Sequence, residues 1–355
     1  MPWCGRPVSR RRYLQLAGGV IGLTILASAG AGAADAEGSN ELVVTVNGGA
    51  FEKFTRAVIF TEFEKRTGGK IIAVTGLTMQ VLAKLRASRD NPTLDVFRMD
   101  PPGMVPAARD GLLHKLAPAH IPNMANLFPW AVPKSGDYVA DNSDYQVLAL
   151  NTKAIQTAPQ TWLDLWKPEY KGRVIIPDIT TSHGILFIAI LSKILTGDFF
   201  NADAAFERLV VLKPNVLTYW TGHDQVIQLL TSGQAWLTPW ISDRAVYQVS
   251  VGAPIDIVVP AKDGAVFVPA NAGISAGTKQ LALAEAYLNI LLDPDVQAQN
   301  AEQIFNGPSN RATPLTGLAK KYYTIADLNL MNLDWDKLLA VQSGWVDRWN
   351  RDMVR

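Results

Sequence analysis

The feature that most constrains the fold is the alternation of short apolar runs with amphipathic helical patterns. The run LVVTV at 42–46 is rich in β-branched residues and ends in a glycine turn, which predicts a strand. Apolar residues at 54, 57, 58, 60 and 63 then recur at helical spacing until Gly68-Gly69. Strands that alternate with helices in this way indicate an α/β fold with a mainly parallel sheet.

The same alternation continues along the chain, with no internal repeat and no low-complexity linker. The expected strands are 42–46, 70–74, 95–99, 145–151, 174–176, 236–239 and 255–259. The expected helices are 54–66, 81–87, 107–112, 161–166 (one turn), 185–195, 204–212, 224–232, 244–249, 281–292, one beginning near 293, and 335–351. Because no flexible joint separates the two α/β units, we expect lobes that share crossover strands.

Residues 1–33 have the pattern of a cleaved export signal. Three arginines at 10–12 precede the apolar run 16–26, and Ala31-Gly32-Ala33 offers the small residues that a signal peptidase requires. The paired arginines before Tyr-Leu favour twin-arginine export, with general secretion as the alternative route. A membrane anchor is the other interpretation, but the apolar run falls short of the roughly 20 residues that span a bilayer. We therefore expect a periplasmic protein.

The charge balance argues against nucleic acid as a partner. The predicted signal contains four arginines and no acid, so the rest of the chain has 29 basic and 32 acidic residues. A nucleic-acid-binding domain of this size would carry a strong basic excess. Cys4 is the only cysteine and lies in the predicted signal. The mature chain is therefore expected to have no disulfide, no thiolate nucleophile and no cysteine metal site.

Familiar catalytic signatures are absent from the sequence. It has no G-x-S-x-G elbow, no H-E-x-x-H pair, no phosphate loop and no G-x-G-x-x-G after a strand. The histidines lie far apart along the chain, at positions 114, 120, 183 and 223. We therefore expect no cofactor, no metal and no catalysis. An enzyme on the same fold would have to use Ser182 with His183, or His223 with Asp224.

A polar cluster follows the apolar run 174–176, where the expected helix 185–195 must begin. It consists of Thr180, Thr181, Ser182 and His183. A single hydroxyl is enough to cap a helix, and a helix start also attracts anionic oxygens. In open α/β sheets, ligands bind beyond the carboxyl ends of the strands. We expect at least two of these side chains to face a ligand, with an ordinary cap and spare threonines as the alternative.

Similar polar clusters follow other predicted strands in both halves of the chain, which points to one cleft lined from two lobes. Any single cluster could be ordinary turn chemistry. The candidate ligand-binding residues are Asn47, Gly48, Thr78, Asp100, Tyr145, Thr180, Thr181, Ser182, His183, Thr221, His223, Trp240, Asp243, Arg244 and Asn271.

Three segments carry a resemblance to a known family. They are TWLDLWKPEYKG at 161–172, GAPIDIVVP at 252–260 and AYLNILLDPDV at 286–296. With these segments, nearly the whole mature chain resembles the periplasmic solute-binding proteins of ABC importers, in the spermidine/putrescine-binding branch. The resemblance implies a two-lobed periplasmic-binding-protein fold of type II, with hinge strands and closure over a small molecule.

The resemblance also implies an assignment of the chain to lobes. We expect 38–143 and 272–320 to form lobe 1 and 144–271 to form lobe 2, and the lobe that carries the C-terminal helical segment 321–355 stays open. In this family the 161–172 segment is a structural elbow, so Trp162, Trp166 and Tyr170 would be packing residues.

The family's polyamine-binding groups do not carry over. Polyamine binders hold ammonium groups with carboxylates and enclose the methylene chain between aromatic rings. Three of the family's acidic positions hold Ile179, Ser182 and Ala270 in this chain. Its aromatic positions hold Asn47, Ala50, Val268 and Asn306. Only Trp240 is expected to keep an aromatic wall, although Asp178 or Asp243 could replace a lost acid.

Hydroxyl, amide and imidazole groups, together with Arg244, take the place of the lost acids and rings. A guanidinium makes bidentate contacts with carboxylate or phosphonate oxygens, although Arg244 could instead pair with Asp243. We therefore expect a substrate-binding protein of an ABC transporter that captures a small anionic or zwitterionic metabolite: a carboxylate, amino acid derivative or phosphonate. A polyamine ligand is the alternative, and a sensor for a chemoreceptor would use the same binding chemistry. The expected partners are the ligand, a membrane permease and its ATPase, and we expect a monomer.

Overall fold

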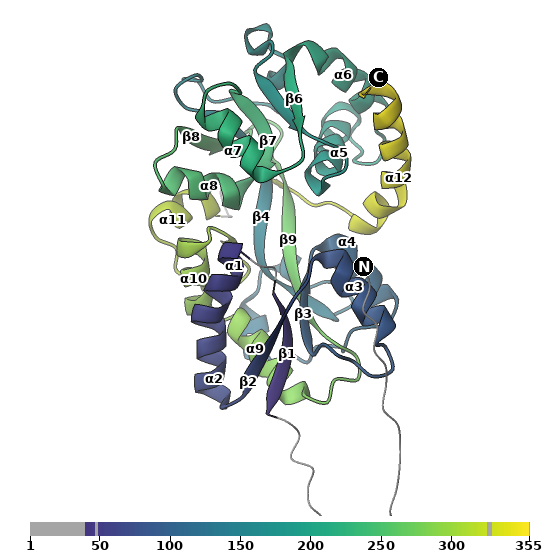
Figure 1. The fold of residues 1–355 in the computed structure, drawn as a ribbon, viewed down its shortest axis with the longest axis vertical. Coiled ribbons are helices and arrows are strands. Elements are labelled where there is room, and N and C mark those ends of the chain that lie inside the picture. The colour runs from purple at the N-terminus through teal and green to yellow at the C-terminus, as the bar shows by residue number, and fades with distance from the viewer. Residues whose placement is uncertain (1–39, 47–48, 325–328, 355) are drawn as a thin grey trace, which may run out of the picture. The chain divides into compact units, whose positions relative to one another are not determined.

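Two long antiparallel strands, β4 (Tyr138–Asn151) and β9 (Ala265–Ile274), run through the centre of the sheet in the computed structural model (Figure 1). The structure describes residues 40–46, 49–324 and 329–354. The chain divides into two units, Met1–Glu37 and Gly38–Arg355, and only the second contains described residues. The expected export signal at 1–33 lies outside the described residues.

The strands of the described chain form one mixed sheet whose main order is β2-β1-β3-β9-β4-β7-β5-β6; off this path, β8 and β10 pair with β4, and β11 pairs with β9. The flanks β2-β1-β3 and β7-β5-β6 are parallel, whereas β3, β9, β4 and β7 pair antiparallel in that order. The remaining bounds are β1 (Glu41–Val46), β2 (Lys70–Thr75), β3 (Val96–Met99), β5 (Val174–Pro177), β6 (Val216–Trp220), β7 (Leu237–Ile241), β8 (Ile255–Val258), β10 (Gly307–Pro308) and β11 (Leu330–Met331).

Helices follow most of the parallel strands, as the alternation in the sequence predicts (Figure 1). Their bounds are α1 (Gly49–Phe54), α2 (Thr61–Thr67), α3 (Thr78–Ala87), α4 (Pro101–Arg109), α5 (Ser182–Thr196), α6 (Asp203–Leu212), α7 (His223–Thr231), α8 (Ser242–Ser250), α9 (Leu281–Leu291), α10 (Pro294–Gln303), α11 (Gly317–Tyr323) and α12 (Trp335–Asp352). A π-helical segment, η1 (Thr55–Phe60), joins α1 to α2. Short 3₁₀ turns are η2 (Pro122–Asn126), η3 (Pro129–Ala131), η4 (Trp162–Trp166), η5 (Pro168–Tyr170) and η6 (Lys213–Asn215).

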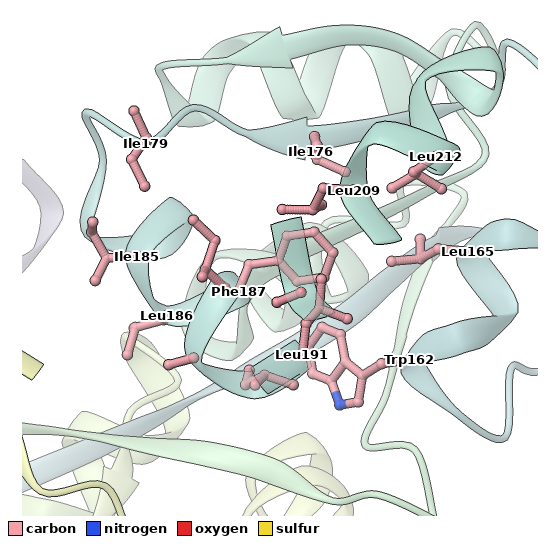
Figure 2. Packing of buried hydrophobic residues seen from close by; sticks show 14 of the residues in the cluster. Trp162, Leu165, Ile176, Ile179, Ile185, Leu186, Phe187, Leu191, Leu209 and Leu212 are labelled. Carbon is pink, nitrogen blue, oxygen red and sulfur yellow. The ribbon is translucent and has the colours of Figure 1, made fainter. Parts of the chain in front are cut away.

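The aromatic elbow at 161–172 packs into the core around α5, as the family resemblance implies. The Trp162 ring is fully buried, lies near Phe187 of α5, and donates its indole N–H to the Gly264 carbonyl at 2.8 Å (Figure 2). Tyr170 is buried in the same hydrophobic cluster as Trp162 and the α5 side chains. Trp166 packs against this cluster and remains partly exposed. The elbow therefore holds the start of β5 against α5.

The C-terminal helix α12 packs on this same core. Leu338, Trp345 and Trp349 are buried in the cluster that contains α5 and α6. The Trp349 ring meets Tyr219 of β6 edge-on at 5.3 Å, and Arg348 forms an ion pair with Asp203 of α6. These contacts place α12 beside the half of the sheet that contains β5 and β6.

Candidate functional site

A cavity of about 370 Å³, lined by both charged and apolar residues, opens where several helices begin. One wall comes from the start of α3 and from the junction of β3 with α4, and the other from the starts of α5, α7 and α8. Strands β4 and β9 and the first residue of α12 complete it. The lining residues are Thr78, Met79, Asp100, Pro101, Pro102, Asp144, Ser182, His183, Leu186, His223, Ile241, Asp243, Arg244, Val268, Ala270 and Trp335.

A second cavity of about 230 Å³ adjoins the first, because five residues line both. The shared residues are Asp100, Asp144, Asp243, Arg244 and Ala270. The smaller cavity adds Phe51, Arg98, Asn142, Tyr247, Gln303, Ile304 and Asn306. We call the two cavities together the cleft. Its shared part contains three carboxylates and one guanidinium.

Asp100 reaches the cleft because β3 ends there and α4 begins immediately after it. Pro101 and Pro102 occupy the first helical positions, where a missing N–H costs nothing. The Thr78 hydroxyl donates to the Asp100 carboxylate at 3.3 Å, and the Asp100 backbone N–H donates to the same hydroxyl at 3.2 Å. Asp100 remains exposed at the start of α4, and partial loss of water around its carboxyl raises its pKa.

Asp144 lies on β4, directly opposite Val268 of β9, and is partly buried. Its carboxylate accepts hydrogen bonds from the Ser242 hydroxyl at 3.2 Å and from the Asn306 amide at 2.8 Å. Loss of water and, second, the nearby charge of Asp243 raise the pKa of Asp144 well above its ordinary value. A cationic group placed between the two acids would relieve both effects.

Asp243 and Arg244 form the first turn of α8 after β7 ends. The Arg244 guanidinium lies 3.6 Å from the Asp243 carboxylate, and its side chain remains 53% exposed. Burial raises the pKa of Asp243, and Arg244 opposes that rise. Arg244 therefore forms a weak ion pair with Asp243, which the sequence offered as the alternative role, and it also lines the cleft.

Two neutral imidazoles, from His183 and His223, line the end of the larger cavity. Their ring centroids lie 5.5 Å apart in an edge-on arrangement. Burial, followed by the charges of His223 and Arg244, lowers the pKa of His183 to about 3. Burial also lowers the pKa of His223. Both rings are therefore uncharged at neutral pH.

Seven of the residues singled out from the sequence line the cleft: Thr78, Asp100, Ser182, His183, His223, Asp243 and Arg244. Six lie elsewhere in the described structure: Tyr145, Thr180, Thr181, Thr221, Trp240 and Asn271. Two, Asn47 and Gly48, lie outside the described residues. The residues that line the cleft lie mostly at the first turns of helices that follow strands. The candidate residues next to them in the sequence point elsewhere.

The two threonines before α5 are used by the turn itself. The Thr180 hydroxyl donates to the Asp178 carboxylate at 2.6 Å. The Thr181 hydroxyl donates to the Asp178 carbonyl at 2.7 Å and accepts from the Gly184 N–H at 3.1 Å, so Thr181 is the N-cap. A Cβ at Gly184 would lie 2.2 Å from the Asp178 carbonyl oxygen, so the turn packs too tightly for any side chain there.

The other residues away from the cleft have structural roles too. Trp240 is fully buried and donates its indole N–H to His223 at 2.9 Å, so it does not form an aromatic wall. Tyr145 is buried against Phe267 and Tyr323. Asn271 is buried and lines a different cavity. Thr221 is exposed, and its backbone N–H donates to the Gln225 side-chain oxygen at 3.3 Å.

Sequence reasoning missed Asp144 and Trp335, which both line the larger cavity. Asp144 directly precedes the expected strand 145–151, and such a position gives no signal until the partner strand β9 is known. Val268, Ala270 and Asn306 do line the cleft. The family resemblance implies that polyamine binders carry ligand-contacting groups at these positions. That alignment was the one available signal for them.

The structure corrects the expectation that this chain has abandoned an acidic pocket. The aligned acidic positions are indeed lost, since Ile179 is buried and Ser182 and Ala270 are uncharged. However, Asp100, Asp144 and Asp243 supply carboxylates to the cleft from other elements. Asp100 and Asp243 are among the candidate residues from the sequence and Asp144 is not, so the cleft is acidic through positions other than the aligned ones.

The described residues contain no cluster of His, Cys, Asp and Glu suited to a metal ion. Within the same part of the chain, no helix is both long enough and apolar enough to cross a bilayer.

Two parallel flanks of one sheet joined by the crossover strands β4 and β9, with a cleft at the helix starts, define a two-lobed solute-binding fold. The profile of the bacterial extracellular solute-binding proteins matches residues 59–326, so the chain belongs to that family. This confirms the expected family, fold class and transport role, in which the protein captures a small polar solute for an ABC importer.

The relatives include proteins for two kinds of nitrogenous solute. The chain is 28% identical over 302 residues to the gamma-aminobutyric acid-binding protein of Pseudomonas aeruginosa, covering 82% of this chain and 83% of that protein. It is 29% identical over 260 residues to the spermidine/putrescine-binding periplasmic protein of Escherichia coli, covering 69% and 72%. Among solved structures, an ABC transporter protein from Clostridium perfringens matches with a TM-score of 0.76 and 26% identity, covering 88% of this chain and 99% of that one.

Proposed function

We propose that this protein captures a small zwitterionic metabolite, carrying an ammonium group and a carboxylate or phosphonate, and delivers it to an ABC permease and its ATPase. The observation that carries the proposal is the meeting of Asp100, Asp144 and Asp243 with Arg244 in the shared part of the cleft. Carboxylates pair with an ammonium group and a guanidinium pairs with an acid group. A zwitterion uses both.

The geometry supports separate binding groups for the two ends of the ligand, with carboxylates for the ammonium group and Arg244 for the acid group. Burial and the charge of Asp243 raise the pKa of Asp144, and burial raises the pKa of Asp243, so an ammonium group beside both would favour their ionised forms. The exposed Arg244 side chain lies beside them, and among the described residues its guanidinium pairs with Asp243 at 3.6 Å. It is therefore available to the ligand's acid group.

A polyamine is the second candidate, because carboxylates outnumber guanidinium groups in the described lining of the cleft. Arg244 argues against it, since a dication beside an exposed guanidinium is repelled. One relative binds gamma-aminobutyric acid, a zwitterion, and another binds spermidine and putrescine. These names support small nitrogenous solutes as a class.

Further parts of the proposal concern where and how the protein acts. We propose that residues 1–33 export it to the periplasm, where it acts as a monomer. We also propose that it binds without turnover. His183 has its Nδ1 atom bonded to an amide, Gln146, and not to the carboxylate that would orient a catalytic base.

Calorimetric titration of the purified mature protein tests the ligand class. The panel contains 4-aminobutanoate, 2-aminoethylphosphonate, putrescine, spermidine and succinate. We expect one or both zwitterions to bind tightest, and Arg244→Met to weaken them about tenfold or more while leaving polyamine binding unchanged or improved. Tight binding of putrescine or spermidine with no response to zwitterions would favour the second candidate. Binding of succinate alone would reject both.

Zwitterion binding should weaken as the pH falls. Burial raises the pKa of Asp144 and of Asp243, so both take up protons at a higher pH than the ordinary value near about 4. A protonated carboxyl cannot pair with an ammonium group, so affinity is highest well above the raised pKa values and falls on acidification through them. Binding then releases protons. Titrations in buffers of different ionisation enthalpy should show that release, and an affinity independent of pH between 8 and 4 would contradict it.

A further inference from the structure

Buried neighbours fix the protons of the two imidazoles that line the cleft. Trp240 donates its indole N–H to Nδ1 of His223 at 2.9 Å. An indole nitrogen can only donate, so Nδ1 of His223 must accept. The proton of the neutral His223 ring therefore lies on Nε2, which becomes a donor.

His183 is held in the opposite tautomer by Gln146. The side-chain amide nitrogen of Gln146 donates to the His183 carbonyl oxygen at 3.3 Å, which sets the orientation of the amide. The amide oxygen consequently faces Nδ1 of His183 at 2.9 Å and accepts its proton. Nε2 of His183 is left as an acceptor.

The free nitrogens of both rings are open to a ligand. His183 and His223 both line the larger cavity, whereas their Nδ1 atoms face the buried side chains of Gln146 and Trp240. Within the described residues, neither Nε2 atom is buried without a hydrogen-bond partner. The cleft therefore presents one neutral acceptor and one neutral donor on rings 5.5 Å apart.

We propose that this imidazole pair selects a ligand that carries a hydroxyl or carboxamide group in addition to its charged groups. Such a group can donate to Nε2 of His183 and accept from Nε2–H of His223. A carboxylate has no proton to donate and an ammonium has no lone pair, so each would leave one ring nitrogen unsatisfied. The inference deepens the proposed function and rests on it, since the carboxylates and Arg244 hold the charged groups. Trp240 and Gln146 are positioning residues.

The tautomers can be tested without any ligand by ¹⁵N NMR of the imidazole rings in the purified protein. We expect His183 to be protonated at Nδ1 and His223 at Nε2. Trp240→Phe should convert His223 into a mixture of both tautomers. Trp220→Phe is the matched control, because Trp220 is also a buried indole but donates to Thr238 at 3.0 Å. The tautomer of His223 should be unchanged in this variant. A wild-type spectrum with His183 protonated at Nε2, or a Trp240→Phe spectrum identical to wild type, would overturn the assignment.

Ligand selection is tested with matched pairs by calorimetry. The pairs are 4-aminobutanoate with 4-amino-3-hydroxybutanoate, and L-norvaline with L-glutamine. We expect the hydroxyl or carboxamide member of at least one pair to bind about tenfold tighter, the size of one hydrogen-bonding group, and the ratio to fall to about twofold in Trp240→Phe but not in Trp220→Phe. Equal affinities within both pairs would overturn the inference and leave the proposed function standing. No binding of any member would contradict the proposed function and this selectivity together.

Discussion

Replacing Arg98 with methionine is expected to destabilise the folded protein by about 3–5 kcal/mol, because it leaves a buried carboxylate without its counter-charge. The Arg98 guanidinium lies 2.7 Å from the Asp141 carboxylate, and the two side chains are only 4% and 3% exposed. The guanidinium also lies over the Phe51 ring, 4.1 Å from its centroid. Burial raises the pKa of Asp141, and the charge of Arg98 offsets part of that rise. Urea denaturation monitored by circular dichroism would measure the loss.

The position of this pair in the sheet explains the large effect. Arg98 lies on β3 and Asp141 on β4, with β9 between the two strands. Asp141 is the extra residue at an irregularity in the β4–β9 ladder, between Ala140 and Asn142. Such bulges redirect a side chain. The ion pair therefore ties the strands of one flank to the crossover strands.

Arg244→Met provides the control for Arg98→Met. Its side chain is 53% exposed and lies 3.6 Å from the Asp243 carboxylate, so its loss should cost less than about 1 kcal/mol. The double variant Arg98→Met/Asp141→Leu should recover most of the stability, since an apolar pair leaves no uncompensated charge. Equal denaturation midpoints for Arg98→Met and Arg244→Met would show that the buried pair does not stabilise the fold.

The sequence predicted five of the six strands in the flanks, β1, β2, β3, β5 and β7, because short apolar runs are easily distinguished from helical patterns. It missed the sixth, β6, in which only Trp220 is fully buried. It did not predict β9, whose sequence AVFVPANAGI mixes proline, asparagine and glycine with small apolar residues. Those residues fit a crossover strand that has neighbours on both sides and lines the cleft, but they lack the period expected of a strand. The start of α4 was missed for a similar reason, since Pro101, Pro102 and Gly103 resemble a loop.

The site was only partly predictable, because facing a cleft depends on pairings that are distant in sequence. The helix starts at Ser182, His223 and Asp243 could be found, since polar residues after a strand mark its carboxyl end. Whether Thr181 or Ser182 faces the ligand is decided by which hydroxyl caps α5. Asp144 could not be found, since its place in the cleft follows from its register with Val268 on an unpredicted strand.

Asp144→Asn is expected to weaken binding of an ammonium-bearing ligand by about 2–4 kcal/mol, or roughly 30- to 1,000-fold, because it removes one charge of a partly desolvated pair. The same change should stabilise the empty protein by about 1 kcal/mol. The pKa of Asp144 is raised in the folded state, so its ionised form costs folding free energy at neutral pH, and this cost grows as the pH rises from the unfolded pKa towards the folded one. Asparagine removes that cost and keeps an oxygen for Ser242, and the Asn306 amide has to turn so that its oxygen accepts from the new amide nitrogen. Calorimetry and thermal denaturation at pH 7 measure the two effects.

Asp178→Asn is the matched control for Asp144→Asn. Asp178 is another acid that follows a strand end, but it bonds Thr180 and does not line the cleft. Asparagine can still accept those bonds, so ligand affinity should stay within about twofold of wild type. If Asp144→Asn binds zwitterions as tightly as Asp178→Asn, the ammonium group is not held at Asp144. If Asp144→Asn loses both affinity and stability, its carboxylate is a structural acceptor for Ser242 and Asn306. The opposite signs expected for binding and folding are what distinguish a binding group from a structural one.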